Sequence, residues 1–453
     1  MARDNTRMNV QPPPTVIRLV TAPCSRRSFL KHIAGGAVAL PFCFHPKLQA
    51  APLPSKRITI GCIGVGNQGG HDTAMLLADP RAQIVAACDV DLARAKAMAA
   101  SIDNHYARES TSGSYRGCAV TQDFREIIAR GDIDAVMIAT PDHTHALIAT
   151  AAARRGKDIY CEKPLAYSVA EGRAIVEAVT RCGRVLQTGT QRRSIGTFRF
   201  MCELVRNGRI GQLHTVRCGP GRGFSVRGDF TGMEGPQPVP ADFNYDLWLG
   251  PAPWTPYTPA RCHFNFRWIL DYGEGYISDN GVHFIDLAMW GIGADDTGPL
   301  HVEGKAIFPS IGIYDAPTDF EITYRFANGV RLILGSAEDF GVKFEGSAGW
   351  LHSNGFSLTA SPEKIRSAVI EPNEIRLRPS PGHHADFLDC VINRRLPAAH
   401  AEIGQRTATV CHIGYIAARL GRPLQWDPQR ELFPADAEAN RLLSRAPREP
   451  WIL

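Results

Sequence analysis

Three ionisable residues in the stretch 273–286 have the types and spacing that could move a proton to or from a hydroxyl group. The stretch is led by glycine and continues into an apolar run, which is typical of a turn that opens a helix. On such a helix Asp279 and His283 would lie four residues apart on one face, with Asp286 on the next turn. Histidine titrates near neutrality and a carboxylate can orient it, so the pair could act as a general acid and base. The alternative is an acid at a helix N-terminus beside a histidine that only packs in the core.

A second candidate for proton transfer is Lys163, in the tripeptide Glu162-Lys163-Pro164. The tripeptide follows residues 158–161, a short stretch that is predicted to be a buried strand. A lysine at the end of a parallel strand, stiffened by the next proline, points at the crevice where such sheets bind ligands. Lys163 could then donate a proton to a hydroxyl or accept one, provided that its surroundings let it lose its own proton. The alternative is an exposed surface lysine.

Three closely spaced glycines, Gly64, Gly66 and Gly69, predict a nucleotide-binding loop. They follow the apolar residues 58–63, predicted to form a buried strand, and precede residues 71–78, predicted to form a helix. In this G-x-G-x-x-G pattern the first glycine permits a tight turn, the second admits a pyrophosphate and the third lets the helix pack closely. The N–H groups at the helix start would face the phosphates. We also assign the other residues of this loop to the cofactor, namely Asn67 and Gln68.

An acidic residue stands where a dinucleotide fold needs one for the ribose hydroxyls. Residues 83–88 form a second predicted strand, which ends at Asp89, twenty residues past Gly69. A carboxylate at this position would repel a 2′-phosphate, so the sequence favours NAD over NADP. Arg94 lies nearby and keeps NADP as an alternative.

Two histidines, His143 and His145, lie in the polar turn that follows a further predicted strand, residues 133–139. They could cap the next helix, expected over residues 146–154, or they could contact cofactor or substrate at the edge of the sheet. No third ligand lies at a recognisable spacing, so we expect no metal site. The cofactor set from this turn and from the strand after it is Thr140, Pro141, His143, His145, Glu162 and Lys163.

The composition sets the class of protein that must position these residues. The chain has 453 residues, 44% hydrophobic and 21% charged, which describes two globular domains rather than one. The net charge is only +5, and no basic stripe with interleaved aromatic residues suggests nucleic-acid binding. The twelve cysteines include no C-x-x-C pair, so the sequence lacks the cysteine spacing that is typical of a zinc site.

The glycine loop, Asp89, the sequence TPDHTHA and the Glu-Lys-Pro tripeptide together resemble the glucose–fructose oxidoreductase, inositol dehydrogenase and rhizopine-catabolism family, written Gfo/Idh/MocA. The resemblance runs from about residue 57 to about residue 427. It implies that Lys163 binds substrate and transfers a proton, and that His283 is the catalytic acid and base with Asp279 as its partner. Glu274 and Asn280 stand where relatives commonly have glycine and methionine, which leaves the substrate's identity open more than the reaction type.

The pattern of elements predicts an α/β fold in two parts after a leader. Residues 56–187 alternate strand and helix, as in a doubly wound parallel Rossmann sheet. Residues 188–427 are expected to form a C-terminal α/β domain with an open, mostly antiparallel sheet, followed by a tail over residues 428–453. In the resembling family the exposed face of that sheet often supports contacts between subunits, so we expect a homo-oligomer.

The second part gathers aromatic and polar side chains that suit a carbohydrate. The stretches 246–257 and 261–272 combine tryptophan, tyrosine and phenylalanine with polar residues. Aromatic rings can stack on the C–H face of a pyranose, but the same rings could simply fill the core between a domain and a loop. As the substrate set we assign Arg192, His263, Trp268 and Asp286.

Residues 1–50 are expected to be an export leader rather than part of the fold. Residues 25–31 read SRRSFLK and open an apolar run to residue 44, too short for a transmembrane helix. The arginine pair resembles the twin-arginine signal, which exports folded proteins. This predicts a periplasmic or otherwise exported protein without a stable membrane anchor. A chance arginine pair before an amphipathic helix is the alternative.

These features favour a nicotinamide-dependent oxidoreductase that acts on a hydroxyl of a sugar, polyol or glycoside. Free NAD is scarce outside the cytoplasm, so an exported enzyme needs a tightly bound cofactor that is recycled. The main rival is therefore an NAD-dependent glycosidase, which some exported relatives of the resembling family exemplify, and which works by transient oxidation, elimination and re-reduction. A sugar-binding protein with a relic nucleotide fold is the third hypothesis, and it predicts disruption of a catalytic set that is intact here.

Overall fold

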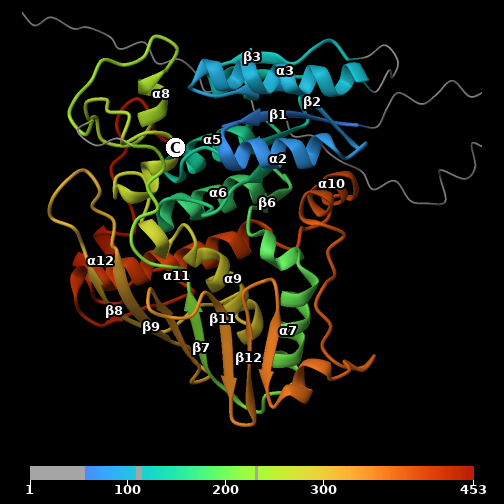
Figure 1. Ribbon diagram of the computed structural model, residues 1–453, viewed down its shortest axis with the longest axis vertical. Coiled ribbons are helices and arrows are strands. Elements are labelled where there is room, and N and C mark those ends of the chain that lie inside the picture. Colours follow the sequence, from blue (N-terminus) through green and yellow to red (C-terminus); the bar gives the residue numbers. More distant parts are fainter. Residues whose placement is uncertain (1–56, 109–114, 230–232) are drawn as a thin grey trace, which may run out of the picture. The chain divides into compact units, whose positions relative to one another are not determined.

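The computed structural model describes residues 57–108, 115–229 and 233–453 (Figure 1). The predicted export leader, residues 1–50, lies outside these residues. Across the described ranges no helix combines the length and the apolar character that crossing a membrane requires.

The first half of the described chain is built on a six-stranded sheet in which every neighbouring pair is parallel. The strand order β3-β2-β1-β4-β5-β6 is that of a doubly wound sheet, as predicted. Most strand residues are buried, because helices cover both faces of such a sheet. The strands are β1 (Ile58–Ile63), β2 (Ala82–Cys88), β3 (Ala119–Thr121), β4 (Ala135–Ile138), β5 (Asp158–Cys161) and β6 (Leu186–Thr188).

The helices of this half are α2 (Asn67–Leu77), α3 (Leu92–Arg108), α4 (Phe124–Ala129), α5 (Asp142–Arg154) and α6 (Val169–Arg181). Two of them, α2 and α5, start earlier than the sequence pattern indicated. Helix α5 begins at Asp142 rather than at residue 146, so His143 and His145 lie inside its first turns. The prediction that they cap this helix is therefore wrong. The residue at the cap position is Pro141.

The second half contains an eight-stranded sheet in the order β13-β12-β11-β7-β10-β9-β8-β14. Only the β7–β10 pair is parallel within this sheet, which agrees with the predicted open, mostly antiparallel sheet. A turn at Gly329 joins β9 to β10, and its φ of +83° lies in the region that favours glycine. The strands are β7 (Leu213–Gly219), β8 (His301–Ile307), β9 (Asp319–Arg325), β10 (Arg331–Gly335), β11 (Gly341–Gly346), β12 (Gly349–Ser353), β13 (Leu358–Ser361) and β14 (Leu424–Gln425).

Three helices pack on this second sheet and one of them also reaches the first. Helices α9 (Gly281–Ile292) and α11 (Ala401–Leu420) contact the sheet directly, α7 (Gly196–Arg206) packs on α9 and β12, and all three contribute to its apolar core. Helix α11 also contacts α6 and β6, and Figure 1 shows it running between the two sheets. The remaining elements are η2 (Gln191–Ser194), α8 (Tyr245–Leu249), η3 (His263–Trp268), η4 (Gly275–Ile277), η5 (Glu363–Ser367), α10 (His383–Asn393) and α12 (Ala437–Arg441).

Strands β8 and β9 alternate buried with more exposed residues, so one face of this sheet packs inward and the other does not. A contact between copies of the chain on the outer face stays a prediction.

A buried ion pair joins the short helix η2 to α9. The guanidinium of Arg193 is 2% exposed, and its Nε donates to both carboxylate oxygens of Asp286 at 2.8 Å. Its Nη2 donates to Asp295 at 2.7 Å. The assignment of Asp286 to the substrate is therefore wrong, because its carboxylate is turned into the core and neutralises a buried arginine. Removing one member of such a pair would leave an uncompensated buried charge.

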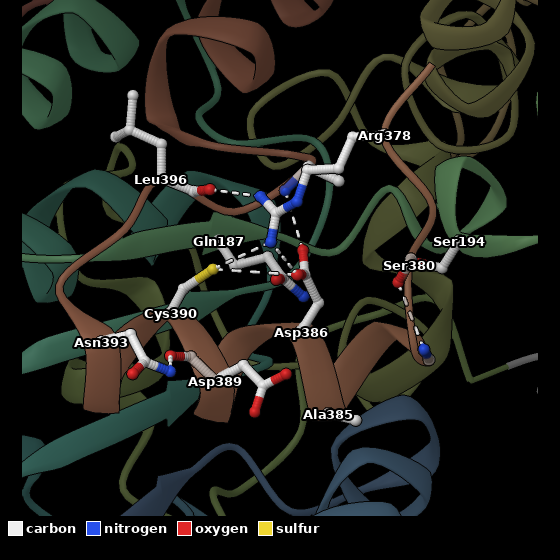
Figure 2. A network of polar contacts seen from close by, with 12 residues as sticks. Gln187, Ser194, Arg378, Ser380, Ala385, Asp386, Asp389, Cys390, Asn393 and Leu396 are labelled. Carbon is white, nitrogen blue, oxygen red and sulfur yellow. Dashed lines mark hydrogen bonds and ion pairs between the residues drawn. The ribbon is translucent and has the colours of Figure 1, made fainter. Parts of the chain in front are cut away.

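Helix α10 is held in place by a polar network that Figure 2 shows. The guanidinium of Arg378 bonds to the carboxylate of Asp386 within α10 and to the backbone carbonyl of Leu396. The other oxygen of Asp386 accepts the backbone N–H of Ala398 at 2.8 Å. From the neighbouring strand β6, Gln187 donates to the carbonyl of His383 at 2.8 Å. These bonds fix the N-terminus of α10 against the first sheet.

A second buried ion pair ties α11 to the loop before α9. Nδ1 of His412 lies 3.0 Å from both carboxylate oxygens of Glu274, and the other ring nitrogen faces the carbonyl of Ala166 at 3.1 Å. Burial alone would lower the pKa of His412, but the charge and hydrogen bonds of Glu274 outweigh burial and raise it above its ordinary value. Glu274 therefore serves packing, and the expectation that it bears on the substrate's identity is wrong.

This raised pKa predicts how the stability of the fold depends on pH. A group whose pKa is higher in the folded state contributes its full stability below the unfolded pKa, about 6.5 for histidine. That stability is lost as the pH rises through the folded-state pKa. We expect the difference in free energy of unfolding between the wild type and the double variant Glu274→Gln, His412→Gln to shrink as the pH rises above about 6.5. Urea unfolding over this range measures it, and a difference that stays constant or grows would contradict the assignment.

Candidate active site

A cavity of about 160 Å³ opens at the carboxyl ends of strands β1, β2, β4 and β5, where a doubly wound sheet binds ligands. The structure brings nine of the twelve residues predicted for the cofactor to its walls, from four separate segments. They are Gly64, Gly66, Asn67, Gln68, Asp89, Thr140, Pro141, Glu162 and Lys163.

The glycines of this cavity leave room that any other residue would fill. Gly64 has a φ of +79°, and a Cβ atom there would lie 2.7 Å from the carbonyl of Ala139. A Cβ atom on Gly69 would lie 1.9 Å from the carbonyl of Gly64, so only glycine lets α2 approach the loop this closely. Gly66 is the N-cap of α2 and offers no side chain to the first N–H groups of the helix. The loop therefore fits a nucleotide whose phosphates would take that place.

Asp89 closes the cavity at the end of β2. Its two carboxylate oxygens accept the backbone N–H groups of Val65 and Asp91, each at 3.0 Å. Burial raises its pKa, and these hydrogen bonds act in the opposite direction. Arg94 also lines the cavity. It therefore lies where its positive charge could bind the 2′-phosphate of NADP, so NADP stays an alternative.

The two histidines predicted to contact the cofactor serve the backbone instead. Nε2 of His143 bonds to the carbonyl of Trp248 at 2.9 Å, and burial lowers the pKa of this histidine to about 3. His145 lies between the carbonyls of Thr140 and Pro164, each 2.8 Å from one ring nitrogen, and burial lowers its pKa to about 4. Neither belongs to the cavity walls that the described residues form. Both hold the 140–145 turn and the Glu-Lys-Pro segment in place, so their assignment to the cofactor is corrected.

A second cavity, of about 290 Å³, adjoins the first. Its walls include Lys163 from the first sheet together with Asp279 and His283 from the second half of the chain. Five residues line both cavities, which places the predicted proton-transfer groups beside the nucleotide cradle. The shared residues are Gln68, Glu162, Lys163, Phe264 and Arg267.

Lys163 and Asp279 form the ion pair that connects the two halves at this site. Nζ of Lys163 donates to Oδ1 of Asp279 at 2.8 Å and to its backbone carbonyl at 2.7 Å. The Nε of Arg267 donates to the same Oδ1 at 3.0 Å. Burial would raise the pKa of Asp279, but the positive charges of Lys163 and Arg267 outweigh it and hold the pKa well below its ordinary value. Asp279 is therefore ionised and fixes the ammonium group at the cavity wall.

His283 lies one turn further on, inside the start of α9. The predicted helix begins at Gly281, so Asp279 stands just before it rather than on its face. His283 is 7% exposed, and the described residues give its Nδ1 no hydrogen-bond partner. Burial lowers its pKa well below the ordinary value, and the charges of Lys163 and Arg192 add to the effect. The imidazole is therefore neutral and free to accept a proton.

The substrate set is brought together only in part. Trp268 is fully buried and lines the second cavity, and its contact with the substrate stays a prediction. His263 lines the nucleotide cavity instead, 3.8 Å from the carboxylate of Asp91. The guanidinium of Arg192 lies over the ring of Phe284 at 4.1 Å, outside the walls that the described residues give both cavities. The assignment of these two residues to the substrate is corrected accordingly.

Arg267 was missed by reasoning from the sequence. It stacks over Phe264 at 4.4 Å and over Phe266 at 4.7 Å while it binds Asp279. The feature of the sequence that could have indicated it is an arginine among the aromatic residues of 261–272, a pattern that suits cation–π packing. Asn280 also lines the second cavity, and its amide donates to the carbonyl of Pro220 at 2.9 Å. Among the described residues no group of three or more histidine, cysteine or acidic side chains could hold a metal ion.

Comparison with known proteins gives this geometry a family. Residues 58–190 match the family described as "Oxidoreductase family, NAD-binding Rossmann fold", and residues 196–453 match "Oxidoreductase family, C-terminal alpha/beta domain". The chain is 26% identical over 284 residues to the uncharacterized oxidoreductase YrbE of Bacillus subtilis, which covers 62% of this chain and 67% of that protein. It is 34% identical over 159 residues to inositol 2-dehydrogenase of Rubrobacter xylanophilus, which covers 35% of this chain and 42% of the relative. The match thus spans less than half the length of that dehydrogenase.

Solved structures share the whole two-part fold. Levoglucosan dehydrogenase in complex with NADH and levoglucosan superposes with a TM-score of 0.60 at 21% identity, covering 82% of this chain and 99% of that one. At this identity the likeness establishes the fold alone. Because the two family models together cover nearly all of the described residues, the chain belongs to the Gfo/Idh/MocA oxidoreductase family, with an NAD-binding Rossmann domain followed by the family's C-terminal α/β domain.

Proposed function

We propose that this protein oxidises a hydroxyl-bearing carbon of a small carbohydrate or polyol, using NAD that stays bound between turnovers. One observation carries the proposal: Lys163 and His283, from different halves of the chain, line one cavity that shares a wall with the nucleotide cradle. A substrate in that cavity would lie within reach of both side chains and of the cofactor.

The residues of the cavity have distinct roles in this reaction. The ammonium group of Lys163, fixed by Asp279, would bind the substrate oxygen and hold it at the cavity wall. The neutral imidazole of His283 would accept the hydroxyl proton. NAD, when bound, would supply the acceptor for the hydride. The buried ring of Trp268 would exclude water and offer an apolar face to the sugar.

The names of similar proteins support a carbohydrate substrate. Relatives are called inositol 2-dehydrogenase, and one of the solved structures holds NADH and levoglucosan. Inositol is a polyol and levoglucosan is an anhydrosugar, so both present secondary hydroxyl groups on a ring.

A test of the reaction needs the purified protein and a panel of polyols, sugars and glycosides, with and without added NAD. We expect nucleotide to be released on denaturation and a ketone product to form in proportion to NADH. Hydrolysis of a glycoside without net consumption of cofactor would select the rival function, an NAD-dependent glycosidase. Absence of turnover on every compound would contradict both.

The matched variant for this test is Lys163→Ala, which should still bind NAD but lose at least about a hundredfold in turnover. The control is Lys305→Ala, which removes an exposed lysine on β8 and should leave turnover unchanged. Undiminished turnover by Lys163→Ala would remove the mechanism.

The preference for NAD over NADP is proposed from Asp89 at the end of β2. Its carboxylate lines the cradle where the ribose hydroxyls would lie and would repel a 2′-phosphate. Asp89→Ala should weaken NAD binding by about 10–100-fold, the cost of hydrogen bonds to a charged group, and should weaken NADP binding less. Calorimetry with both nucleotides measures the ratio, with Asp103→Ala on α3 as control. An equal loss of affinity for both nucleotides would instead indicate that Asp89 only holds the glycine loop in place, through its hydrogen bond with the backbone N–H of Val65.

We also propose that the chain is exported by the twin-arginine route, on the support of residues 25–31. Export of a folded protein would let NAD be loaded before transport. Replacing Arg26 and Arg27 by lysine should retain the protein in the cytoplasm, as cell fractionation would show, whereas Arg18→Lys upstream of the motif should not. Equal export of the double variant would contradict the route.

A further inference from the structure

Behind the catalytic lysine a second acidic group lies in the protein interior. Glu162 precedes Lys163 and is 4% exposed, yet it lines both cavities. One of its carboxylate oxygens accepts the hydroxyl of Tyr160 at 3.0 Å, and the other accepts the backbone N–H of Lys163 at 3.1 Å. A Cβ atom on Gly189 would lie 2.4 Å from this carboxylate, so the glycine leaves the space that the carboxylate occupies.

Glu162 contacts another buried acid, Asp72 of helix α2. Asp72 is fully buried, and its Oδ1 faces Nε2 of Gln68 at 2.9 Å and Nε2 of His384 at 3.1 Å. The carboxyl groups of Glu162 and Asp72 are close enough to influence each other's charge. Tyr160 links them, because its hydroxyl donates to Glu162 and its ring stacks on His384, which faces Asp72. Among the described residues no N–H or hydroxyl group donates to Oδ2 of Asp72. Two ionised carboxylates side by side in the protein interior would repel each other, so the pair favours holding one proton.

The surroundings of the pair favour keeping that proton near neutral pH. Burial is the main cause that raises the pKa of each acid, and the charge of Asp72 raises that of Glu162 further. The charge of Lys163 and the proximity of His71 act against this, together with the hydrogen bonds from Gln68 and Tyr160. From α10, His384 faces the pair, and burial lowers its pKa.

His384 leads from the pair toward the surface. Its ring stacks on Tyr160 with centroids 5.2 Å apart, and lies 6.3 Å from the ring of the exposed His71. Helix α10, which carries His384 in its first turn, is anchored by the Arg378–Asp386 network of Figure 2. The imidazole is thereby held against Asp72 rather than left to move with a loose helix end.

We propose that Glu162 and Asp72 share one proton and relay protons through His384 between the active-site cavity and the surface near the exposed His71. The inference rests on the proposed oxidation, in which each alcohol yields a ketone, a hydride for NAD⁺ and one proton. His283 takes that proton from the hydroxyl and releases one into the cavity that it lines with Glu162, where one proton is added to Glu162. The shared proton passes to Asp72, and Nε2 of His384, in its unprotonated tautomer, accepts one from Asp72. The N–H at Nδ1 of the same ring then releases one proton toward solvent. The net result is one proton released for each NADH, and reduction of a ketone would run the same steps in reverse.

The shared proton can be tested without turnover. Infrared spectroscopy of the purified protein should show a protonated-carboxyl band at neutral pH that is lost in Glu162→Gln and in Asp72→Asn. The matched control is Glu171→Gln, which removes a buried acid that instead pairs with Arg445 at 3.1 Å and should keep the band. A band that survives both variants, or that depends on Glu171, would overturn the shared proton.

The relay itself is tested by stopped-flow kinetics with a pH indicator, following NADH and released protons in the same first turnover. In the wild type both should appear together. In Asp72→Asn, NADH should form with unchanged NAD affinity while proton release slows by at least about tenfold. In His384→Ala added imidazole should restore the rate of proton release, which a packing role would not allow.

Proton release that keeps pace with NADH in both variants would overturn the relay. If the wild type forms no NADH on any substrate, the proposed oxidation fails, and the infrared result alone decides whether the acids share a proton.

Discussion

The ion pair between Lys163 and Asp279 is the interaction on which the candidate site depends. The lysine ends a strand of the first sheet, and the aspartate lies in the loop before α9 on the second, so the pair exists only when both halves are packed together. Arg267 adds a second positive charge to the same oxygen, which keeps the carboxylate ionised in spite of its burial. An ammonium group held this way has a defined position beside the nucleotide cradle, and positioning of this kind is what a proton-transfer site requires.

Other buried ionisable groups in the same region are also paired with an opposite charge. Each of these ion pairs fixes one element of the fold against another. Arg193 with Asp286 fixes η2 against α9, and Glu274 with His412 fixes α11 against the active-site loop. His283 differs because no carboxylate pairs with it among the described residues, so burial keeps it neutral. The site thus combines a fixed cation with a neutral imidazole, and the buried ion pairs around it hold the elements that carry both.

Much of the site could be predicted because its signals are local in the sequence. The glycine spacing, Asp89 and the Glu-Lys-Pro tripeptide each follow a strand, and the ends of parallel strands meet at one edge of a sheet. The failures have a common physical cause, which is a partner far away in the chain. His143 bonds to Trp248, Asp286 to Arg193, and Glu274 to His412. Nothing in the local pattern distinguishes a polar side chain that faces a ligand from one that satisfies a distant buried group.

The end of strand β5 explains how one short segment can serve two purposes. Side chains alternate along a strand, so Tyr160 and Glu162 project to the same side, where they meet Asp72 and the imidazole of His384. Lys163 is the next residue, and its side chain points the other way, across the cavity to Asp279. The backbone N–H of Lys163 meanwhile donates to Glu162. A proton route that starts at this tripeptide therefore needs no additional element, because the alternation of the strand already places one carboxyl group between the catalytic cavity and the interior of the nucleotide domain.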